Sequence, residues 1–412
     1  MGTQTNPGKQ IFHFFRRGLA KNWLKLMPAT QIGITGSFGK TNTTRAIAQV
    51  LSSSFQVIQT DLNLDTIYNL PITGLKVRPW SQVAVFELGI DQREEMDRHL
   101  EIVRPKIGVV TGITPVHSDE EHLGSLQNII KEKQKLIAAL PQDGLAVLNG
   151  DDENVRPMAK FTKAKVLFYG TDKKNCQIWA EKIKPGLKGL AFTLWAGRES
   201  YKVKTPLLGR HQIYTCMAAT AVGREMGLPM AAIISALSGL SNLKGRLSLE
   251  KGPLGVMLLD DHLRANPEST KAGLIFLKDL KTSGRKIAVL GEMGELGEWA
   301  VEKHKEIGRL AAGCGLDFLV CVGPLQKYAV ESAVESGMDK DKTIWFADVF
   351  SASEKLKTIL QKGDLFYLKG SLLQHVERIL LLLENKPVGC RVVSCHFYHQ
   401  CPVCPFLQTG PQ

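Results

Sequence analysis

Residues 31–41 read Gln31-Ile32-Gly33-Ile34-Thr35-Gly36-Ser37-Phe38-Gly39-Lys40-Thr41, an apolar run followed by a glycine-rich loop. The β-branched run is typical of a buried strand, and the residues from 41 to 52 have the spacing of a helix. In a strand–loop–helix unit of this kind, backbone N–H groups and the helix N-terminus point at one place and favour an anion there. The stretch therefore predicts a phosphate-binding loop in an α/β fold.

The loop is an incomplete match to the motif G-x-x-x-x-G-K-[ST], because its first glycine would fall at Ile34. In such a loop the lysine, here Lys40, reaches the β and γ phosphates, and the following hydroxyl, here Thr41, binds Mg²⁺. The predicted nucleotide-binding residues are Thr35, Gly36, Ser37, Gly39, Lys40 and Thr41.

Short apolar runs alternate with helical patterns along most of the chain, as in parallel sheets covered by helices. A polar stretch at 241–246 suggests a domain boundary, and short alternating runs at 169–206 suggest a small β insertion. The predicted strands are 31–35, 83–87, 107–111, 145–149, 255–260, 286–290, 317–322 and 364–368. The predicted helices are 41–52, 123–140, 269–280, 300–314 and 371–385.

Length and composition exclude several classes of protein. At 412 residues the chain is long enough for two or three domains, and 44% hydrophobic residues exclude a disordered chain. It contains no run of eighteen apolar residues and no signal-peptide pattern at its start, so we expect a cytoplasmic protein. The net charge of +12 suits anionic ligands without selecting one.

The first 28 residues predict a basic amphipathic helix. We expect the helix to pack on the first domain; weak contact with an anionic membrane surface is the alternative. Apolar residues recur every four positions: Ile11, Phe15, Leu19, Trp23 and Met27. Basic residues lie two positions from these, on the opposite face of the helix: Arg17, Lys21 and Lys25.

Candidate metal ligands follow two of the predicted strands. Glu87 ends the strand 83–87, and His117 follows the strand 107–111. Strand ends in a parallel sheet meet at the ligand crevice, so both residues could join Thr41 there. Mg²⁺ prefers oxygen, so a histidine ligand would need an explanation. Lysines 131, 133 and 135 lie on the next helix, and the spacing alone selects none of them.

The second half of the chain has three further polar strand ends. These are Asp260-Asp261 followed by Asn266, the run 291–297, and Lys369-Gly370-Ser371. The glycine spacing in 291–297 is wrong for a dinucleotide fingerprint, so we assign it no cofactor. Lys369-Gly370-Ser371 is a second candidate anion-binding turn.

Taken in order, these motifs resemble the Mur ligase family, the ATP-dependent ligases that build the peptidoglycan stem peptide. The resemblance extends over about residues 30–386 and is greatest to the branch that adds D-alanyl-D-alanine to a UDP-muramoyl-tripeptide. It rests on Thr35–Thr41, Phe86-Glu87-Leu88-Gly89, His117 through Gly124-Ser125 to Lys131-Glu132-Lys133, Asn149-Gly150-Asp151-Asp152, Gly209-Arg210-His211, Gly245-Arg246-Leu247, Asp260-Asp261, Ala265-Asn266-Pro267, Gly291–Gly297, His304 and Lys369-Gly370-Ser371.

The resemblance implies a central P-loop-type domain with a mostly parallel sheet at 29–242, and a Rossmann-like α/β domain at 243–386. The implied reaction joins a carboxylate to an amine through an acyl phosphate, using ATP and two Mg²⁺, in a monomer with no nucleic-acid partner. The implied catalytic residues are Lys40, Glu87, His117 and a carbamylated Lys133; the implied metal ligands are Thr41, Glu87, His117 and Lys133; Arg246, Asp260 and Asn266 would contact the nucleotide.

Some positions differ from the family pattern. Only about 28 residues precede the first strand, where the family has a UDP-sugar-binding domain, which implies a reduced uridine site. Leu263-Arg264, Leu372, Asp65 and Asn69 replace the family's Tyr-Asn, Arg, Asn and Gly. The substrates therefore stay open: the acceptor is the UDP-linked tripeptide, or a lipid-linked, poly-amino-acid or folate-like molecule. A non-catalytic nucleotide-binding homologue is the remaining alternative, although the intact phosphate and metal residues argue against it.

Residues 387–412 form a cysteine-rich tail beyond the resemblance. A zinc site on four cysteines is one interpretation, since cytosolic cysteine pairs bind metal more often than they form disulfides. Only five residues separate the two pairs, which is short for a zinc ribbon, so we expect a disordered appendage without zinc. The cysteines and nearby histidines are Cys390, Cys395, Cys401, Cys404, His396 and His399.

Overall fold

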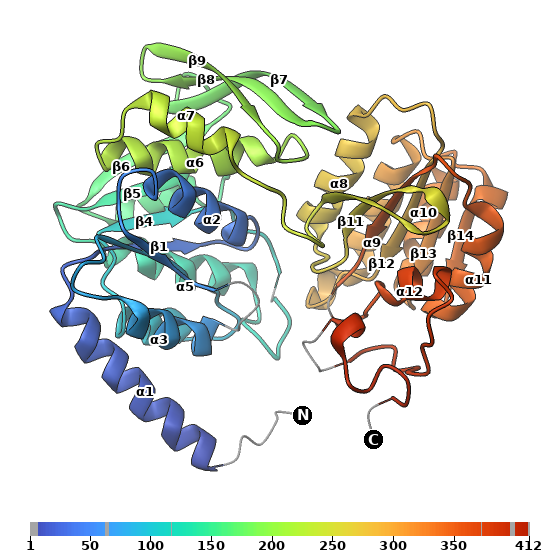
Figure 1. The fold of residues 1–412 in the computed structure, drawn as a ribbon, viewed down its shortest axis with the longest axis horizontal. Helices are drawn as coiled ribbons and strands as arrows, with labels where there is room; N and C mark the ends of the chain where they lie inside the picture. Colours follow the sequence, from blue (N-terminus) through green and yellow to red (C-terminus); the bar gives the residue numbers. More distant parts are fainter. Residues whose placement is uncertain (1–6, 62–65, 117, 372, 396–399, 411–412) are drawn as a thin grey trace. The chain divides into compact units, whose positions relative to one another are not determined.

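The computed structural model describes residues 7–61, 66–116, 118–371, 373–395 and 400–410, and the side chains of 7–11 and 66 are not among them. The chain divides into two compact units, each built on its own sheet with helices on both faces (Figure 1), which confirms the predicted α/β class. Unit 1 holds Met1–Lys184, Ala191–Thr205 and His211–Leu240, and unit 2 holds Pro185–Leu190, Pro206–Arg210 and Ser241–Gln412. Outside the described residues lie His117, Asn63, Asp65, Leu372, His396 and His399.

The sheet of unit 1 has the strand order β2-β3-β1-β4-β5-β6-β7-β8-β9 and is parallel from β2 to β7. β1 lies between β3 and β4, so the chain crosses from one side of β1 to the other, and such a switch point opens a ligand crevice at the carboxyl ends of the strands. The strands are β1(Thr30–Thr35), β2(Val57–Gln59), β3(Val83–Glu87), β4(Ile107–Val110), β5(Leu145–Asn149), β6(Lys165–Gly170), β7(Ile178–Gly186), β8(Gly189–Ala196) and β9(Glu199–Thr205).

Helices cover both faces of this sheet. α2, α6 and α7 pack on one face, and α3 and α5 on the other, where an extensive apolar core lies (Figure 1). The helices are α1(Pro7–Leu26), α2(Lys40–Leu51), α3(Thr66–Lys76), α4(Glu95–Leu100), α5(Leu126–Ala138), α6(Gln212–Glu225) and α7(Met230–Ser238), with a 3₁₀ turn η1(Arg156–Phe161). The predicted β insertion at 169–206 contains the expected short strands, but they extend the main sheet as β7–β9.

Helix α1 forms as predicted, but its predicted apolar stripe is only partly buried. Ala20 and Leu24 are buried against α3, where Gly74 admits the Leu24 side chain, while Phe15 and Leu19 are more than 60% exposed. A four-residue spacing turns by about 40° per step around a helix of 3.6 residues per turn, so the stripe winds away from the domain. The side chain of Ile11 lies outside the described part.

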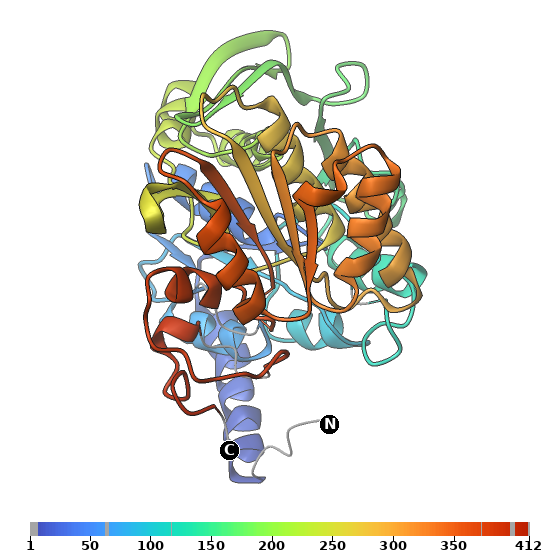
Figure 2. The ribbon, with the colours of Figure 1, turned by 90° about the vertical axis from the view of Figure 1, so that its right-hand side faces the viewer.

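The sheet of unit 2 has the order β10-β11-β15-β12-β13-β14, with only the edge pair β10–β11 antiparallel (Figure 2). α8, α9 and α10 pack in one layer, and α11 and α12 cover the other face around a second apolar core. The elements are β10(Ser248–Lys251), β11(Met257–Asp261), α8(Pro267–Asp279), β12(Lys286–Gly291), α9(Ala300–Ala312), β13(Phe318–Val322), α10(Gln326–Glu335), β14(Thr343–Phe346), α11(Val349–Ile359), β15(Leu365–Lys369) and α12(Arg378–Leu383), with 3₁₀ turns η2(Pro253–Gly255), η3(Gly297–Trp299), η4(Lys340–Lys342) and η5(Cys401–Val403).

Two expectations for the end of the chain are wrong. The helix predicted at 371–385 begins only at Arg378, because His375 has a φ of 50° and the backbone before it forms turns. The described part of the tail is not a disordered appendage either. Its backbone bonds to the domain, with Cys395 N–H donating to Leu373 O at 2.7 Å, and Cys390 and Cys401 are buried.

Among the described residues, no helix is long and apolar enough to cross a membrane.

Candidate functional site

Two glycines shape the loop between β1 and α2. Gly39 has a φ of 74° at the N-cap of α2, a conformation that glycine adopts without steric cost. Gly36 has a φ of 149°, and a Cβ atom there would lie 2.0 Å from Thr111 Oγ1. The loop therefore requires glycine at both positions, and the N-terminus of α2 opens onto it.

A neighbouring strand end holds the loop in place. Thr111 Oγ1 donates to Phe38 O at 2.5 Å, and Ser37 N–H donates to Gly112 O at 2.7 Å. Asn149, at the end of β5, donates to Thr111 O at 2.8 Å. Sequence reasoning missed Thr111 as a loop contact; the only available signal was a hydroxyl residue followed by glycine at the end of a predicted strand.

Lys40 folds back over the loop that precedes it. Its Nζ donates to Gly36 O at 2.8 Å, and the side chain is half-buried. A cation held at the open side of a glycine-rich loop lies where phosphate oxygens would be received. The geometry therefore places the charge of Lys40 beside the anion-binding backbone.

Thr41 and Glu87 meet at the carboxyl ends of β1 and β3. Thr41 Oγ1 donates to Glu87 Oε1 at 3.2 Å, and Glu87 N–H donates to Thr60 Oγ1 at 3.0 Å. Both side chains are half-buried, so water and ligands reach them. A hydroxyl and a carboxylate are the hard oxygen donors that Mg²⁺ prefers, so this pair fits the predicted metal.

The structure distinguishes the three lysines of α5. Lys131 is exposed, and Lys135 pairs with Asp97 and Glu132 at 2.5 and 2.7 Å. Lys133 is only 1% exposed, and burial, helped by the nearby charge of Lys40, lowers its pKa to about 7. Lys133 therefore differs from the other two lysines in having an amine whose pKa is near neutral pH and which lies close to Lys40 of the glycine-rich loop.

Two acids that sequence reasoning missed lie near Lys133. Asp91 and Glu95 oppose the lowering of the Lys133 pKa, although burial outweighs them. Glu95 Oε2 accepts from the N–H groups of Asp91 and Gln92 at 2.7 and 3.1 Å, which holds this turn after β3 in place. No motif in the sequence distinguishes them from ordinary surface acids.

The remaining predicted nucleotide contacts lie in unit 2. Asp260 is buried at the end of β11 and bonds His262 Nδ1 at 2.5 Å. Asn266 caps α8, where its Oδ1 accepts from Ser269 N–H at 2.8 Å, and Arg246 is half-buried. These positions keep their roles as predictions.

Neighbouring strand ends in unit 2 carry a buried ion pair. Lys369 Nζ donates to Asp261 Oδ2 at 2.8 Å, and Tyr367 OH donates to the same oxygen at 3.1 Å. Burial raises the pKa of Asp261 and lowers that of Lys369. The lysine of the predicted second anion-binding turn is therefore already paired.

The run 291–297 is held by side chains. Glu292 accepts from Leu325 N–H at 2.5 Å, and its own N–H donates to Gln374 Oε1 at 2.7 Å. His304 Nε2 accepts from Met293 N–H at 3.1 Å while Nδ1 donates to Ala300 O at 2.6 Å; burial lowers the His304 pKa. This bonding requires a neutral imidazole and indicates a structural role for the motif.

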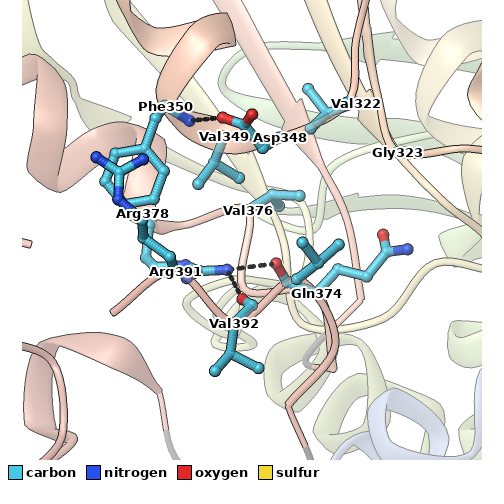
Figure 3. Close-up of a pocket in the computed structure, with 12 residues that line it drawn as sticks. Val322, Gly323, Asp348, Val349, Phe350, Gln374, Val376, Arg378, Arg391 and Val392 are labelled. Atoms are coloured by element: carbon cyan, nitrogen blue, oxygen red, sulfur yellow. Dashed lines mark hydrogen bonds between the residues drawn. The ribbon is translucent and has the colours of Figure 1, made fainter. Parts of the chain in front are cut away.

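A recess opens beside the ends of β13 and β14 (Figure 3). The tail lines it through Arg391, whose guanidinium stacks over Phe350 at 4.4 Å, and through Val392. Arg378 borders the recess and donates to Val392 O at 2.7 Å. The tail is thus part of the surface of this unit.

Comparison with known proteins follows the same division of the chain. Residues 34–223 match the model of the Mur ligase middle domain, and residues 245–372 match that of the Mur ligase glutamate ligase domain.

Individual relatives agree with these matches. The chain is 30% identical to the UDP-N-acetylmuramoyl-tripeptide–D-alanyl-D-alanine ligase of Bacillus subtilis, over 90% of this chain and 79% of that protein. It is 30% identical to the ligase of the same name from Escherichia coli, over 86% and 77%. A crystal structure of MurF from Acinetobacter baumannii superposes with a TM-score of 0.82 at 25% identity, covering 91% of this chain and 81% of that one.

Proposed function

The chain belongs to the Mur ligase family, and we propose that it is an ATP-dependent ligase that joins UDP-N-acetylmuramoyl-tripeptide to D-alanyl-D-alanine. The observation that carries the proposal is the contact between Thr41 and Glu87 beside the phosphate-binding loop. It brings a metal-binding hydroxyl and carboxylate to the place where the loop and Lys40 receive phosphate.

The proposed reaction has two steps. The substrate carboxylate attacks the γ-phosphorus of ATP, which forms an acyl phosphate and releases ADP. The amine then attacks the acyl carbon, the C–N bond forms, the C–O bond to phosphate breaks, and the amine proton passes to solvent. Negative charge develops on the transferring phosphoryl group, so fixed cations and N–H donors lower the barrier.

The residues of the loop have distinct roles in this proposal. The backbone around Gly36 and Gly39 binds the phosphates of ATP, and Lys40 exchanges its bond with Gly36 O for a phosphate oxygen. Thr41 and Glu87 hold Mg²⁺, which supplies positive charge to the phosphates when bound. His117 completes the set by family likeness and lies outside the described residues.

Lys133 serves as a carbamate in this proposal. The lysine first loses a proton to become a neutral amine. The amine then attacks CO₂, the N–C bond forms and a second proton is released, so that a buried cation becomes an anion. A pKa lowered to about 7 leaves a large fraction of the amine neutral at physiological pH. The product is a carboxylate-like group that suits a second Mg²⁺.

The nucleotide contacts of unit 2 complete the proposal. Arg246 offers a cation to phosphate, Asp260 a carboxylate to the ribose, and Asn266 the Nδ2 group of its amide to adenine. The Oδ1 atom of Asn266 is already used in the helix cap, which orients the amide.

Phosphate release tests the proposed reaction. ATP is incubated with the protein and with UDP-muramoyl-tripeptide and D-alanyl-D-alanine, alone and together, and mass spectrometry identifies the product. Release that requires both substrates supports the proposal. Release with a lipid-linked, poly-amino-acid or folate-like acceptor instead would assign a different substrate, and no release with any pair would indicate a non-catalytic homologue.

Helix α1 supports a weak membrane contact in addition. Phe12, Phe15, Leu19 and Leu26 are 61–75% exposed, and at about 100° per residue they fall within one face of the helix. Arg16 lies over the Phe12 ring at 5.5 Å, so a cation borders this apolar face. Such a surface suits an anionic bilayer.

Vesicle sedimentation tests this contact. We expect the protein to co-sediment with anionic but not zwitterionic vesicles, and the variant Phe15→Ser/Leu19→Ser to lose this binding. Equal binding by the variant would contradict the proposed contact.

The proposal also treats the ligase as a monomer, so sedimentation equilibrium should give the mass of one chain, 45.4 kDa.

A further inference from the structure

Three metal-binding side chains meet in unit 2, and none of them belongs to the proposed catalytic set. His375, Glu377 and Cys401 each offer a ligand atom, and these atoms lie within 4.8 Å of one another. All three side chains are buried, with exposed fractions of 3–5%. Residues of the turn just before α12 and of the tail therefore converge on one point.

The tail is held at this point by hydrogen bonds. Arg378 donates to Cys390 O at 2.9 Å. It also donates to Val392 O at 2.7 Å (Figure 3), and the two bonds hold the first part of the tail against α12. Cys401 N–H donates to Glu377 Oε1 at 3.0 Å, which brings in the second part. Specific hydrogen bonds between the tail and the domain therefore bring the three side chains of the cluster together.

The pair of His375 and Glu377 uses one polar side-chain atom of each residue and leaves the other without a partner in the described part of the chain. His375 Nδ1 bonds Glu377 Oε1 at 2.9 Å. His375 Nε2 and Glu377 Oε2 are buried and have no hydrogen-bond partner among the described residues. Buried polar groups without partners are costly and rare in native proteins, and the unpartnered Glu377 Oε2 is an oxygen available to a metal.

The backbone at the cluster is strained. His375 has a φ of 50°, which residues other than glycine seldom adopt. This conformation interrupts the predicted helix and brings the His375 ring beside Glu377. Strain of this kind is retained where the surrounding structure or a ligand compensates for it.

The donor set selects the class of metal. Imidazole, carboxylate and thiol together suit Zn²⁺, whereas Mg²⁺ and Ca²⁺ take oxygen ligands. Cys404 follows Cys401 in a Cys-x-x-Cys turn in which Cys404 N–H donates to Cys401 O at 3.1 Å. Paired cysteines in such a turn are typical of structural zinc sites.

We propose that His375, Glu377, Cys401 and Cys404 bind one structural Zn²⁺ that fastens the C-terminal tail to unit 2. Binding replaces the hydrogen bond between His375 Nδ1 and Glu377 with a bond from each side chain to the metal. Both cysteines bind as thiolates and release their two protons to solvent, and the neutral imidazole of His375 keeps its one proton on Nε2. This ligand set differs from an all-cysteine site, because two of its members, His375 and Glu377, come from the turn just before α12.

Elemental analysis of the full-length protein tests the site. The protein is purified without a histidine tag, and we expect one zinc per chain. His375→Gln and Cys401→Ser should lower zinc affinity by about tenfold or more in a competition with a chromogenic chelator. Cys314→Ser is the matched control and should retain zinc, since Cys314 is a buried cysteine of the same unit that lies two residues after the end of α9.

Replacing zinc with Co²⁺ gives a second test, which reports on the metal ligands of the wild-type protein and so does not depend on the stability of the variants. Wild-type protein stripped of zinc should give the absorption of tetrahedral thiolate-bound Co²⁺, and Cys404→Ser should weaken the thiolate band while the far-ultraviolet circular dichroism is unchanged. A zinc-free protein that neither binds added zinc nor gains thermal stability from it would overturn the proposal. Loss of zinc in Cys390→Ser and Cys395→Ser, with retention in His375→Gln, would also overturn it. Ligase turnover is not the readout, so this test stands apart from that of the proposed function.

Discussion

Thr41 and Glu87 lie 46 positions apart in the sequence, yet Thr41 Oγ1 donates a hydrogen bond to Glu87 Oε1 at 3.2 Å. The contact follows from the strand order, because β1 and β3 are neighbours and Ile34 pairs in register with Glu87. Thr41, the residue after Lys40, is thereby placed against the carboxylate that ends the neighbouring strand β3. All but the last of the predictions below concern this part of unit 1, and the last concerns unit 2.

Replacing Lys40 with Ala should reduce ligase turnover by at least about a hundredfold, because the loop would lose the cation placed for the transferring phosphate. Turnover is measured as phosphate release with both substrates present. Lys131→Ala, an exposed lysine of α5, is the control and should retain full activity. Full activity in Lys40→Ala would contradict the assignment of the loop.

The hydroxyl of Thr41 should matter through Mg²⁺. Thr41→Val keeps the shape of the side chain but removes the oxygen, so the Mg²⁺ concentration for half-maximal turnover should rise by about tenfold or more. Thr41→Ser retains the hydroxyl and should stay close to wild type. Equal Mg²⁺ dependence in the Val and Ser variants would show that the hydroxyl does not bind the metal.

Lys133 should affect stability in a defined pH window. Its pKa falls from 10.5 in the unfolded chain to about 7 in the folded protein, so between these values the unfolded chain binds more protons. In CO₂-free buffer the wild type should gain up to about 1.4 kcal/mol per pH unit relative to Lys133→Met as the pH rises from 7 to 10.5. Urea unfolding at several pH values measures this, and parallel pH profiles would refute it.

The same lysine should react with CO₂. Wild-type protein equilibrated with ¹³C-bicarbonate should show a carbamate carbon by NMR, Lys131→Ala should show it too, and Lys133→Ala should not. We expect Lys133→Ala to be nearly inactive and to recover partly with acetate, which can occupy the position of the carbamate. A fully active Lys133→Ala would disprove this role.

Gly36→Ala should damage the loop. A Cβ atom would lie 2.0 Å from Thr111 Oγ1, so either the loop or the end of β4 must shift. We expect a loss of about 1–3 kcal/mol in the free energy of unfolding and a clear loss of ATP affinity. Gly18→Ala on α1 is the control, since nothing lies within 4 Å of a Cβ atom there. Unchanged ATP affinity in Gly36→Ala would show that the loop tolerates the shift.

The ion pair of Lys369 and Asp261 should be costly to break from one side. Lys369→Met leaves a buried carboxylate without its cation and should destabilise the protein by about 3–5 kcal/mol. The double variant Lys369→Met/Asp261→Leu removes both charges and should recover most of that loss. Denaturant unfolding of the single and double variants checks this, and equal losses in both would indicate that packing, not charge, is responsible.

Much of the fold is predictable because its signals are local. The strands near 31–35, 83–87, 286–290 and 364–368 are short β-branched runs between helical patterns, and the structure places strands at all four. The helix predicted at 371–385 was wrong because apolar spacing carries no information about the φ of His375. The α1 stripe failed for a related reason, since a periodic pattern does not show which part of a helix reaches the domain.

The sequence by itself determined the α/β class and the glycine-rich loop between β1 and α2, since a strand, two glycines and a Gly-Lys-Thr triplet are contiguous and their backbone preferences are local. Only the tertiary structure selected Lys133 from three lysines on one helix, because its pKa depends on burial and on the charge of Lys40, which is distant in the sequence. Only the tertiary structure brought Cys401 to His375 and Glu377. Pairings of that kind depend on how the chain folds back on itself, and spacing along the chain does not encode them.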